Sequence, residues 1–254
     1  MKIEDKFTEL QQRGEAALIA YYTFGFPSVA ESLKNISLLA KNGADMIEIG
    51  IPFSDPLADG PVIQKASYIA LQNKVNLPLV FDSLSQLKCN IPLIIMSCIN
   101  PILRYGLKKT LEQSKRAKVS GFIIQDLPVD EATEYINVAN SNKIDTIFLL
   151  TPSSTEERIK MGLQYSKGFI YCVSVTGTTG MRNKINNSTI GFIQKVSKLT
   201  SMPVAVGFGV STQEQVRELK KYANGIIIGS RLIMAVMDGE NLSYLIRELK
   251  QGTL

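Results

Sequence analysis

The chain has 254 residues, of which 45% are hydrophobic and 20% charged, a composition typical of a soluble globular protein. No apolar run approaches the ~18 residues that a membrane-spanning helix needs, and the opening MKIEDKFTEL lacks the apolar region of a signal peptide. The sequence contains no histidine, which excludes Ser-His-Asp and Cys-His catalysis. We therefore expect a cytoplasmic protein, or one of the plastid stroma if an organelle encodes it.

The net charge of +5 and the pI near 9.0 raise the question of nucleic-acid binding. Basic residues occur singly or in pairs, such as Lys108–Lys109 and Lys220–Lys221, scattered among acids. A groove-reading protein would gather them on one face. We expect neither a nucleic-acid nor a membrane partner, and the charge favours attraction of an anionic substrate instead.

Eight short apolar runs recur along the chain and are typical of parallel strands covered by helices on their outer faces. In chain order they span residues 16–24, 45–51, 91–97, 121–126, 145–151, 168–174, 203–209 and 225–230.

The segments between these runs carry helix signals. The first, SVAESLKNISLLAKNG, opens with Ser28, has Glu31 three residues later and ends at Gly43, which indicates a capping box and a glycine C-terminus. Similar openings occur at Ser154 and at Ser211.

Eight strand–helix units in a chain of this length predict a (β/α)₈ TIM barrel, in the α/β class, as a single domain over residues 1–254. We expect an N-terminal helix that caps the barrel floor and an extra helix between strands 2 and 3, near Leu77–Leu87. A doubly wound open sheet is the alternative. In both folds, chemistry belongs just beyond the C-terminal ends of the strands.

Glu48 lies within the second run, where the alternation places Ile47 and Ile49 on the opposite face. If those isoleucines face the helices, Glu48 points into the barrel. A carboxylate in an apolar interior is costly, and the usual result is a raised pKa. Such a glutamate can act as both acid and base near neutral pH. The alternative is that Glu48 pairs with a buried lysine or arginine and serves packing.

Asp55 and Asp59 follow in the loop SDPLADGP. Each is also a turn signal, because aspartate bonds nearby backbone groups. The combination with Glu48 favours function: a loop at the end of strand 2 can fold Asp59 back over the barrel mouth. The buried acid would then move protons while the wetter one stays ionised and holds a donor.

Glycines end the last strands, in VGFGVS and IIIGSRL. Glycine lets an anion approach backbone N–H groups, and a helix starting at Ser230 would add further donors. Since loops after strands 7 and 8 are common phosphate sites in barrels, we predict phosphate binding there. SVTGTTG, after strand 6, is a further source of donors.

The stretch IEIGIPFSDPLADGPVIQ closely resembles the signature of the tryptophan synthase alpha subunit family. The resemblance continues in order through NPI, DLP, the strand-6 tyrosine with its S-x-x-G-x-T-G motif, GFG and GS, and it covers essentially the whole chain. It implies a (β/α)₈ barrel that cleaves indole-3-glycerol phosphate to indole and glyceraldehyde 3-phosphate in the last steps of tryptophan biosynthesis.

The resemblance also implies roles. Glu48 would be the general acid–base, Asp59 would accept a hydrogen bond from the indole N–H, and Tyr171 would support the site. Thr179 would belong to a loop that closes over Asp59. The phosphate-binding residues would be Gly180, Gly209, Gly229 and Ser230. No cofactor or metal is expected in this chain. Pyridoxal phosphate would belong to a beta-subunit partner in an α₂β₂ assembly, with Asp55 at the contact.

Three positions depart from the family pattern: Phe26, Cys98 and Thr178. We expect them to lie on the pocket wall and the strand-6 loop. Three other functions stay open: a module whose main role is to stimulate the beta subunit, with its own turnover weakened by these departures; a different phosphate-binding barrel acting on an aminated sugar or an anthranilate adduct; and a stand-alone lyase that releases free indole.

Overall fold

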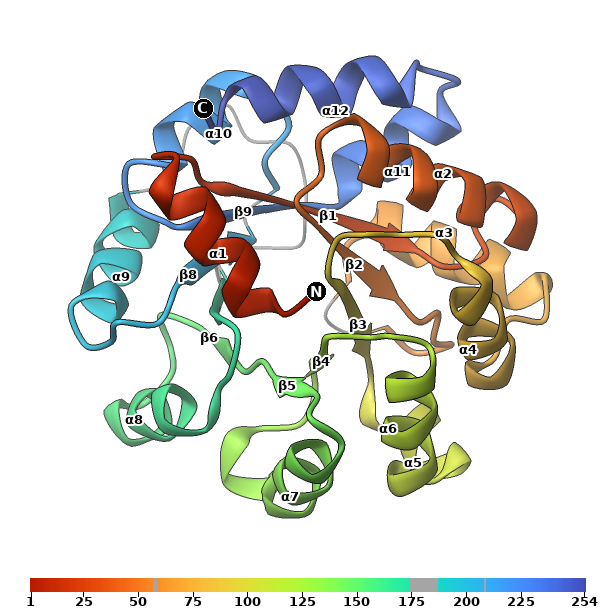
Figure 1. The fold of residues 1–254 in the computed structure, drawn as a ribbon, viewed down its shortest axis with the longest axis horizontal. Coiled ribbons are helices and arrows are strands. Elements are labelled where there is room, and N and C mark those ends of the chain that lie inside the picture. The colour runs from red at the N-terminus through yellow and green to blue at the C-terminus, as the bar shows by residue number, and fades with distance from the viewer. Residues whose placement is uncertain (57–58, 174–186, 208) are drawn as a thin grey trace.

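The computed structural model describes residues 1–56, 59–173, 187–207 and 209–254. Strands and helices alternate along almost the whole chain, and the helices form a ring outside the strands (Figure 1). The strands are β1 (Ala17–Thr23), β2 (Met46–Gly50), β3 (Leu93–Ser97), β4 (Gly121–Ile124), β5 (Asp145–Thr146), β6 (Leu149–Leu150), β7 (Ile170–Val173), β8 (Val204–Gly207) and β9 (Gly225–Ile228).

The helices are α1 (Ile3–Gln12), α2 (Val29–Asn42), α3 (Pro61–Gln72), α4 (Leu77–Gln86), α5 (Ile99–Tyr105), α6 (Leu107–Arg116), α7 (Thr133–Asn142), α8 (Glu156–Tyr165), α9 (Asn187–Ser197), α10 (Gln213–Leu219), α11 (Ser230–Met237) and α12 (Leu242–Gln251), with a 3₁₀ turn, η1 (Val129–Glu131).

The sheet closes into a barrel. Its strands are all parallel, in the order β5–β4–β3–β2–β1–β9–β8–β7–β6. The two ends of this order, β5 and β6, are halves of one segment, residues 145–150. The Ile147 amide donates to Phe122 O at 3.1 Å and the Tyr171 amide donates to Phe148 O at 3.3 Å, so the segment joins both edges. The predicted (β/α)₈ barrel is confirmed.

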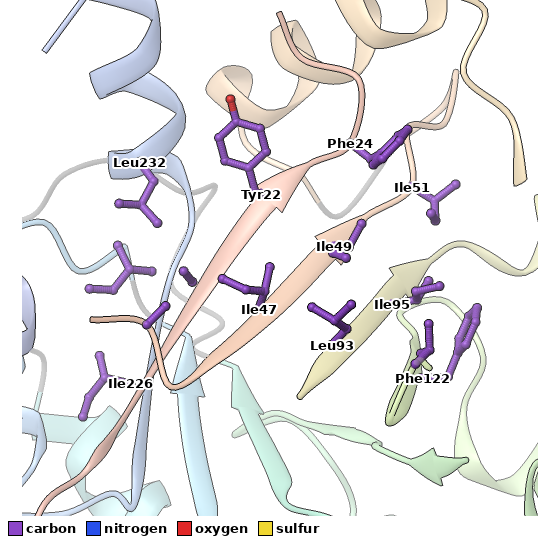
Figure 2. Packing of buried hydrophobic residues seen from close by; sticks show 14 of the residues in the cluster. Tyr22, Phe24, Ile47, Ile49, Ile51, Leu93, Ile95, Phe122, Ile226 and Leu232 are labelled. Atoms are coloured by element: carbon purple, nitrogen blue, oxygen red, sulfur yellow. The ribbon is translucent and has the colours of Figure 1, made fainter. Parts of the chain in front are cut away.

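Alternate strand residues separate two apolar cores. Side chains on the outer face, Ile47, Ile49 and Ile95 among them, pack between strands and helices (Figure 2). Those on the inner face, such as Ile19 and Met46, fill the barrel. Because successive strand residues point to opposite faces, the outward position of Ile47 and Ile49 turns Glu48 inward.

Helix α1 covers the floor of the barrel, at the N-terminal ends of the strands. It crosses that opening in Figure 1, and its Ile3, Phe7 and Leu10 join the inner core. The predicted capping helix is therefore confirmed. The extra helix expected near Leu77–Leu87 is also present, as α4, which begins with an N-cap from Asn76.

The N-cap of α2 forms as predicted: the Ser28 hydroxyl accepts the Glu31 amide at 3.2 Å. The predicted starts at Ser211 and Ser154 are each wrong by one residue. Helix α10 is capped by Thr212, which forms a reciprocal capping box with Gln215. Helix α8 is capped by Thr155, whose hydroxyl accepts the Arg158 amide at 3.2 Å. Where two hydroxyl residues are adjacent, the second one caps the helix.

Candidate active site

Glu48 lies in the middle of β2 and points into the barrel. Its exposed fraction is 0%, and neither carboxyl oxygen has a hydrogen-bond partner among the described residues. Burial, with a smaller contribution from the Asp59 charge, raises the pKa of Glu48 to about 8. A buried acid without a partner favours its protonated form. At neutral pH, Glu48 therefore holds a proton that it can give up.

Asp59 lies in the loop between β2 and α3, over the mouth of the barrel. The loop is held at this point by two bonds: the Asp59 amide donates to Pro56 O at 3.1 Å, and Gln64 Nε2 donates to Asp59 O at 2.7 Å. Burial raises the pKa of Asp59 to about 6. The Asp59 charge also acts on Glu48, which places both carboxyls in one site.

The different environments of the two acids separate their protonation states. Between pH 6 and 8, the pKa values of about 8 and about 6 leave Glu48 protonated and Asp59 ionised. This division into a proton carrier and a fixed anion is the arrangement that acid–base chemistry on a substrate requires.

Two tyrosines complete the wall of the site. Tyr171 on β7 faces the interior, as its predicted supporting role requires, and Tyr21 on β1 also does so. Sequence reasoning missed Tyr21. The signal that could have found it is the alternation of β1, in which position 21 shares the inner face with Ile19.

Gly229 and Ser230 lie where β9 passes into α11: Gly229 is the N-cap of that helix and Ser230 is its first residue. Gly209 follows β8 with a φ of +59°, a conformation that favours glycine. The three residues are thus at the C-terminal ends of neighbouring strands. Thr179 and Gly180, like Thr178, lie outside the described residues.

Asp55 is exposed on the same loop as Asp59. A groove runs beside it, lined by residues of the loop and of α4 and α5, including Phe53, Ser54, Leu77, Asn100 and Tyr105. The Leu103 side chain, on α5, is 59% exposed. The loop thus carries an exposed acid beside a groove, and α5, which lines part of that groove, also carries an exposed apolar side chain.

Two departures from the family pattern have different surroundings. Phe26 is buried in the outer core, where its carbonyl accepts the Tyr22 hydroxyl at 2.9 Å; the expectation that it lies on the pocket wall is wrong. Cys98 lies at the end of β3, and its Sγ accepts Gln125 Nε2 at 3.0 Å. Burial raises the pKa of the Cys98 thiol to about 11, against the effect of the Gln125 bond.

Within the described ranges, no three His, Cys, Asp or Glu side chains gather as metal ligands do. No helix in the same ranges has the length and apolar character to cross a bilayer.

Fold and site together define a (β/α)₈ barrel with an acidic site, formed by Glu48 on β2 and Asp59 on the loop that follows. A family model described as "Tryptophan synthase alpha chain" matches residues 7–252. The chain belongs to the tryptophan synthase alpha chain family.

The relatives agree over nearly the full length. The alpha chain of Methanosarcina mazei is 43% identical, with 100% of this chain and 94% of the relative covered. The alpha chain of Dehalococcoides mccartyi is 46% identical, with 93% and 94% covered. Among solved structures, tryptophan synthase of Mycobacterium tuberculosis superposes with a TM-score of 0.93 at 32% identity, covering 99% of this chain and 97% of that one.

Proposed function

We propose that this chain cleaves indole-3-glycerol phosphate to indole and glyceraldehyde 3-phosphate, a retro-aldol step in tryptophan biosynthesis, and that residues 1–254 act as one barrel domain. Membership of the family supports the reaction. The observation that carries the mechanism is the fully buried carboxyl of Glu48, which lies beside Asp59 and has no hydrogen-bond partner in the described part of the chain.

The reaction needs a proton at indole C3 before the carbon–carbon bond can break. Protonated Glu48 supplies it, which leaves a positive charge shared with the indole nitrogen. The Asp59 carboxylate accepts the N–H and stabilises that charge. The newly formed Glu48 carboxylate then takes the proton of the neighbouring glycerol hydroxyl. As the aldehyde forms, the bonding electrons return to the ring, and Glu48 is protonated again.

The phosphate of the substrate would be bound at the ends of the last strands by Gly209, Gly229 and Ser230, together with Thr179 and Gly180. Gly209 and Gly229 follow β8 and β9, where a residue without a side chain lets an anion approach the backbone, and the start of α11 adds a favourable dipole. Tyr171 would form the wall beside Glu48. This arrangement holds the glycerol phosphate chain between the phosphate site and the acid–base residue.

We further propose that the partner is a beta subunit in an α₂β₂ assembly in the cytoplasm, and that this subunit carries pyridoxal phosphate. Relatives solved as tryptophan synthase support this. Asp55 and the adjacent groove are the proposed contact. Replacing Asp55 with alanine should weaken beta-subunit binding in calorimetric titration. Glu248→Ala, an exposed acid on α12, should leave it unchanged.

The decisive experiment follows indole release from indole-3-glycerol phosphate by the purified chain, with and without a beta subunit. Glu48→Gln should lower kcat by roughly 10²- to 10⁴-fold, the usual contribution of a general acid–base, while circular dichroism and partner binding stay unchanged. Near-wild-type cleavage by Glu48→Gln would refute the acid–base role. If the wild-type chain releases no indole in either condition, the lyase proposal fails and the activating-module alternative gains support.

A further inference from the structure

Tyr21 and Glu48 are neighbours across the β1–β2 ladder. They are direct register partners in this parallel pair, and both side chains belong to the inner face of the barrel. Partners in register that share a face lie side by side. Tyr21 is therefore fixed beside the acid–base residue by the strand pairing itself.

The Tyr21 hydroxyl reaches the end of β2. A Cβ atom added to Gly50, the last residue of β2, would lie 2.1 Å from the Tyr21 hydroxyl oxygen. On the other side, a Cβ added to Gly229 would lie 3.1 Å from Tyr21 Cδ1. The ring thus extends between the strand that carries Glu48 and the proposed phosphate site. Its hydroxyl stands where the loop to Asp59 begins.

The hydroxyl is also a poor fit for a packing role. Among the residues that the structure describes, its hydrogen-bond partner is the Thr23 hydroxyl, at a long 3.4 Å. Desolvating a hydroxyl for such a weak bond costs stability, and a phenylalanine would fill the same volume without that cost. The structure therefore carries a buried donor that its own packing does not require.

The charges around the hydroxyl fix its behaviour. Burial raises the pKa of Tyr21 well above its ordinary value, and the Asp59 charge raises it further, ahead of the Glu48 charge. The other titratable groups facing it are Cys98, after β3, and Tyr171, on β7. The phenol stays protonated, so toward a carboxylate it can only donate.

The charges of Glu48 and Asp59 act on Tyr21 and Tyr171 in opposite order of strength. The charge that acts most strongly on Tyr171 is that of Glu48, with a weaker contribution from Asp59. At Tyr21 the order is reversed, with Asp59 ahead of Glu48. Both acids thus act on both tyrosines, and the Asp59 charge is the larger of the two only at Tyr21.

We propose that Tyr21 is a positioning residue for Asp59: its hydroxyl is the donor that holds the Asp59 carboxylate over the barrel mouth when substrate is bound. This inference rests on the proposed function, since it assigns Asp59 its partner in the same reaction. Tyr21 acts on the reaction through Asp59.

The test compares Tyr21→Phe with the wild-type full chain. Loss of a hydrogen bond to a charged group should lower kcat by roughly 10- to 100-fold, with little change in KM. Because a donor favours the ionised form of Asp59, its removal should move the acid limb of the kcat profile to higher pH. The kcat profile is the relevant one, since it reports the substrate complex.

The chain supplies a matched control in the next residue. Tyr22 faces outward, where its hydroxyl donates to Phe26 O at 2.9 Å and accepts from Asn35 Nδ2 at 2.8 Å. Tyr22→Phe should lower the melting temperature and leave kcat and its acid limb unchanged. Tyr21→Phe should show the opposite pattern, with the melting temperature unchanged or raised.

A second variant displaces the hydroxyl while the tyrosine remains. Gly50→Ala places a methyl group against it and should reproduce both the loss of kcat and the shifted acid limb. A wild-type kcat and acid limb in Tyr21→Phe would overturn the inference, as would a loss of kcat that only follows the folded fraction. If the wild type and Tyr22→Phe both fail to cleave the substrate, it is the proposed function that fails.

Discussion

Lys250, in the last helix, donates to the carboxyl group of Asp45 at the start of β2, with Nζ 2.9 Å from Oδ2. The same ammonium lies 3.0 Å from Glu15 Oε2, and Asp45 also accepts the Leu18 amide at 2.7 Å. Burial nevertheless raises the pKa of Asp45, more than Lys250 lowers it. This cluster connects α12 to the first two strands at the barrel floor, the end opposite the site.

Lys250→Met should lower the free energy of unfolding by about 2 kcal/mol. This is less than the cost of breaking a fully buried ion pair, because the groups of this cluster are partly exposed. The stability falls because two partly buried carboxyls lose their cation. Urea denaturation measures the change, and kcat for the folded enzyme should not move. Lys41→Met, at an exposed lysine without an ion pair to any described residue, is the control. Equal stability of the two variants would contradict the prediction.

The pH dependence of kcat/KM should be bell-shaped, with limbs near pH 6 and pH 8. The acid limb reflects Asp59, whose pKa is raised to about 6 by burial and which must be ionised. The basic limb reflects Glu48, whose pKa is raised to about 8 and which must be protonated. Initial rates of indole release between pH 5 and 9 test this. A profile that stays flat above pH 8 would exclude Glu48 as the proton donor.

Glu48→Gln should stabilise the protein, and more at pH 8 than at pH 5. Burial raises the pKa of Glu48 to about 8 in the folded protein, from an ordinary value of 4.5. Below pH 4.5, Glu48 is protonated in both the folded and the unfolded protein, and its burial then costs least stability. As the pH rises from 4.5 toward 8, Glu48 ionises only in the unfolded protein, so the free energy of unfolding falls by up to about 1.4 kcal/mol per pH unit.

Glutamine does not titrate and so avoids this loss. Urea midpoints of wild type and variant at the two pH values give the comparison. Asp55→Asn, which removes an exposed carboxyl from the following loop, is the control. A difference between wild type and Glu48→Gln that is the same at both pH values would show that Glu48 is not held protonated by the fold.

Gly229→Ala should raise KM about tenfold, the effect of about 1.4 kcal/mol of lost binding, and should weaken competitive inhibition by inorganic phosphate. The added methyl would lie 3.1 Å from Tyr21 Cδ1, so it crowds the start of α11 where phosphate is proposed to bind. Gly191→Ala, on α9 with open space around the new methyl, should leave KM unchanged. Inhibition constants equal to wild type would contradict the phosphate assignment.

The strands and the inward direction of Glu48 were predictable because they depend on local alternation. Ile47 and Ile49 must face the helices, and the residue between them then has one direction left. The division of residues 145–150 into β5 and β6 was not predictable, because it arises where one segment changes pairing partner.

Other features belong to the assembled barrel. That Glu48 has no hydrogen-bond partner among the described residues depends on every strand around it. The alignment of Tyr21 with Glu48 depends on the register between two strands. Sequence periodicity places Tyr21 and Tyr22 on opposite faces but does not say which tyrosine meets the acid. The predicted cap of α10 was wrong by one residue for a simpler reason. Ser211 and Thr212 are both good N-cap residues, and the contacts of Gln215 favour Thr212.

The seam between β1 and β9, where Ala17 pairs with Gly225, has a consequence for synthesis on the ribosome. β1 leaves the ribosome first, but one of its edges forms no strand–strand hydrogen bonds until β9, the last strand, has been synthesised. Pairing over such a separation is slow, and an open strand edge can recruit another chain in the meantime. Nascent chains halted before residue 225 will therefore be prone to aggregate and will depend on chaperones until translation resumes.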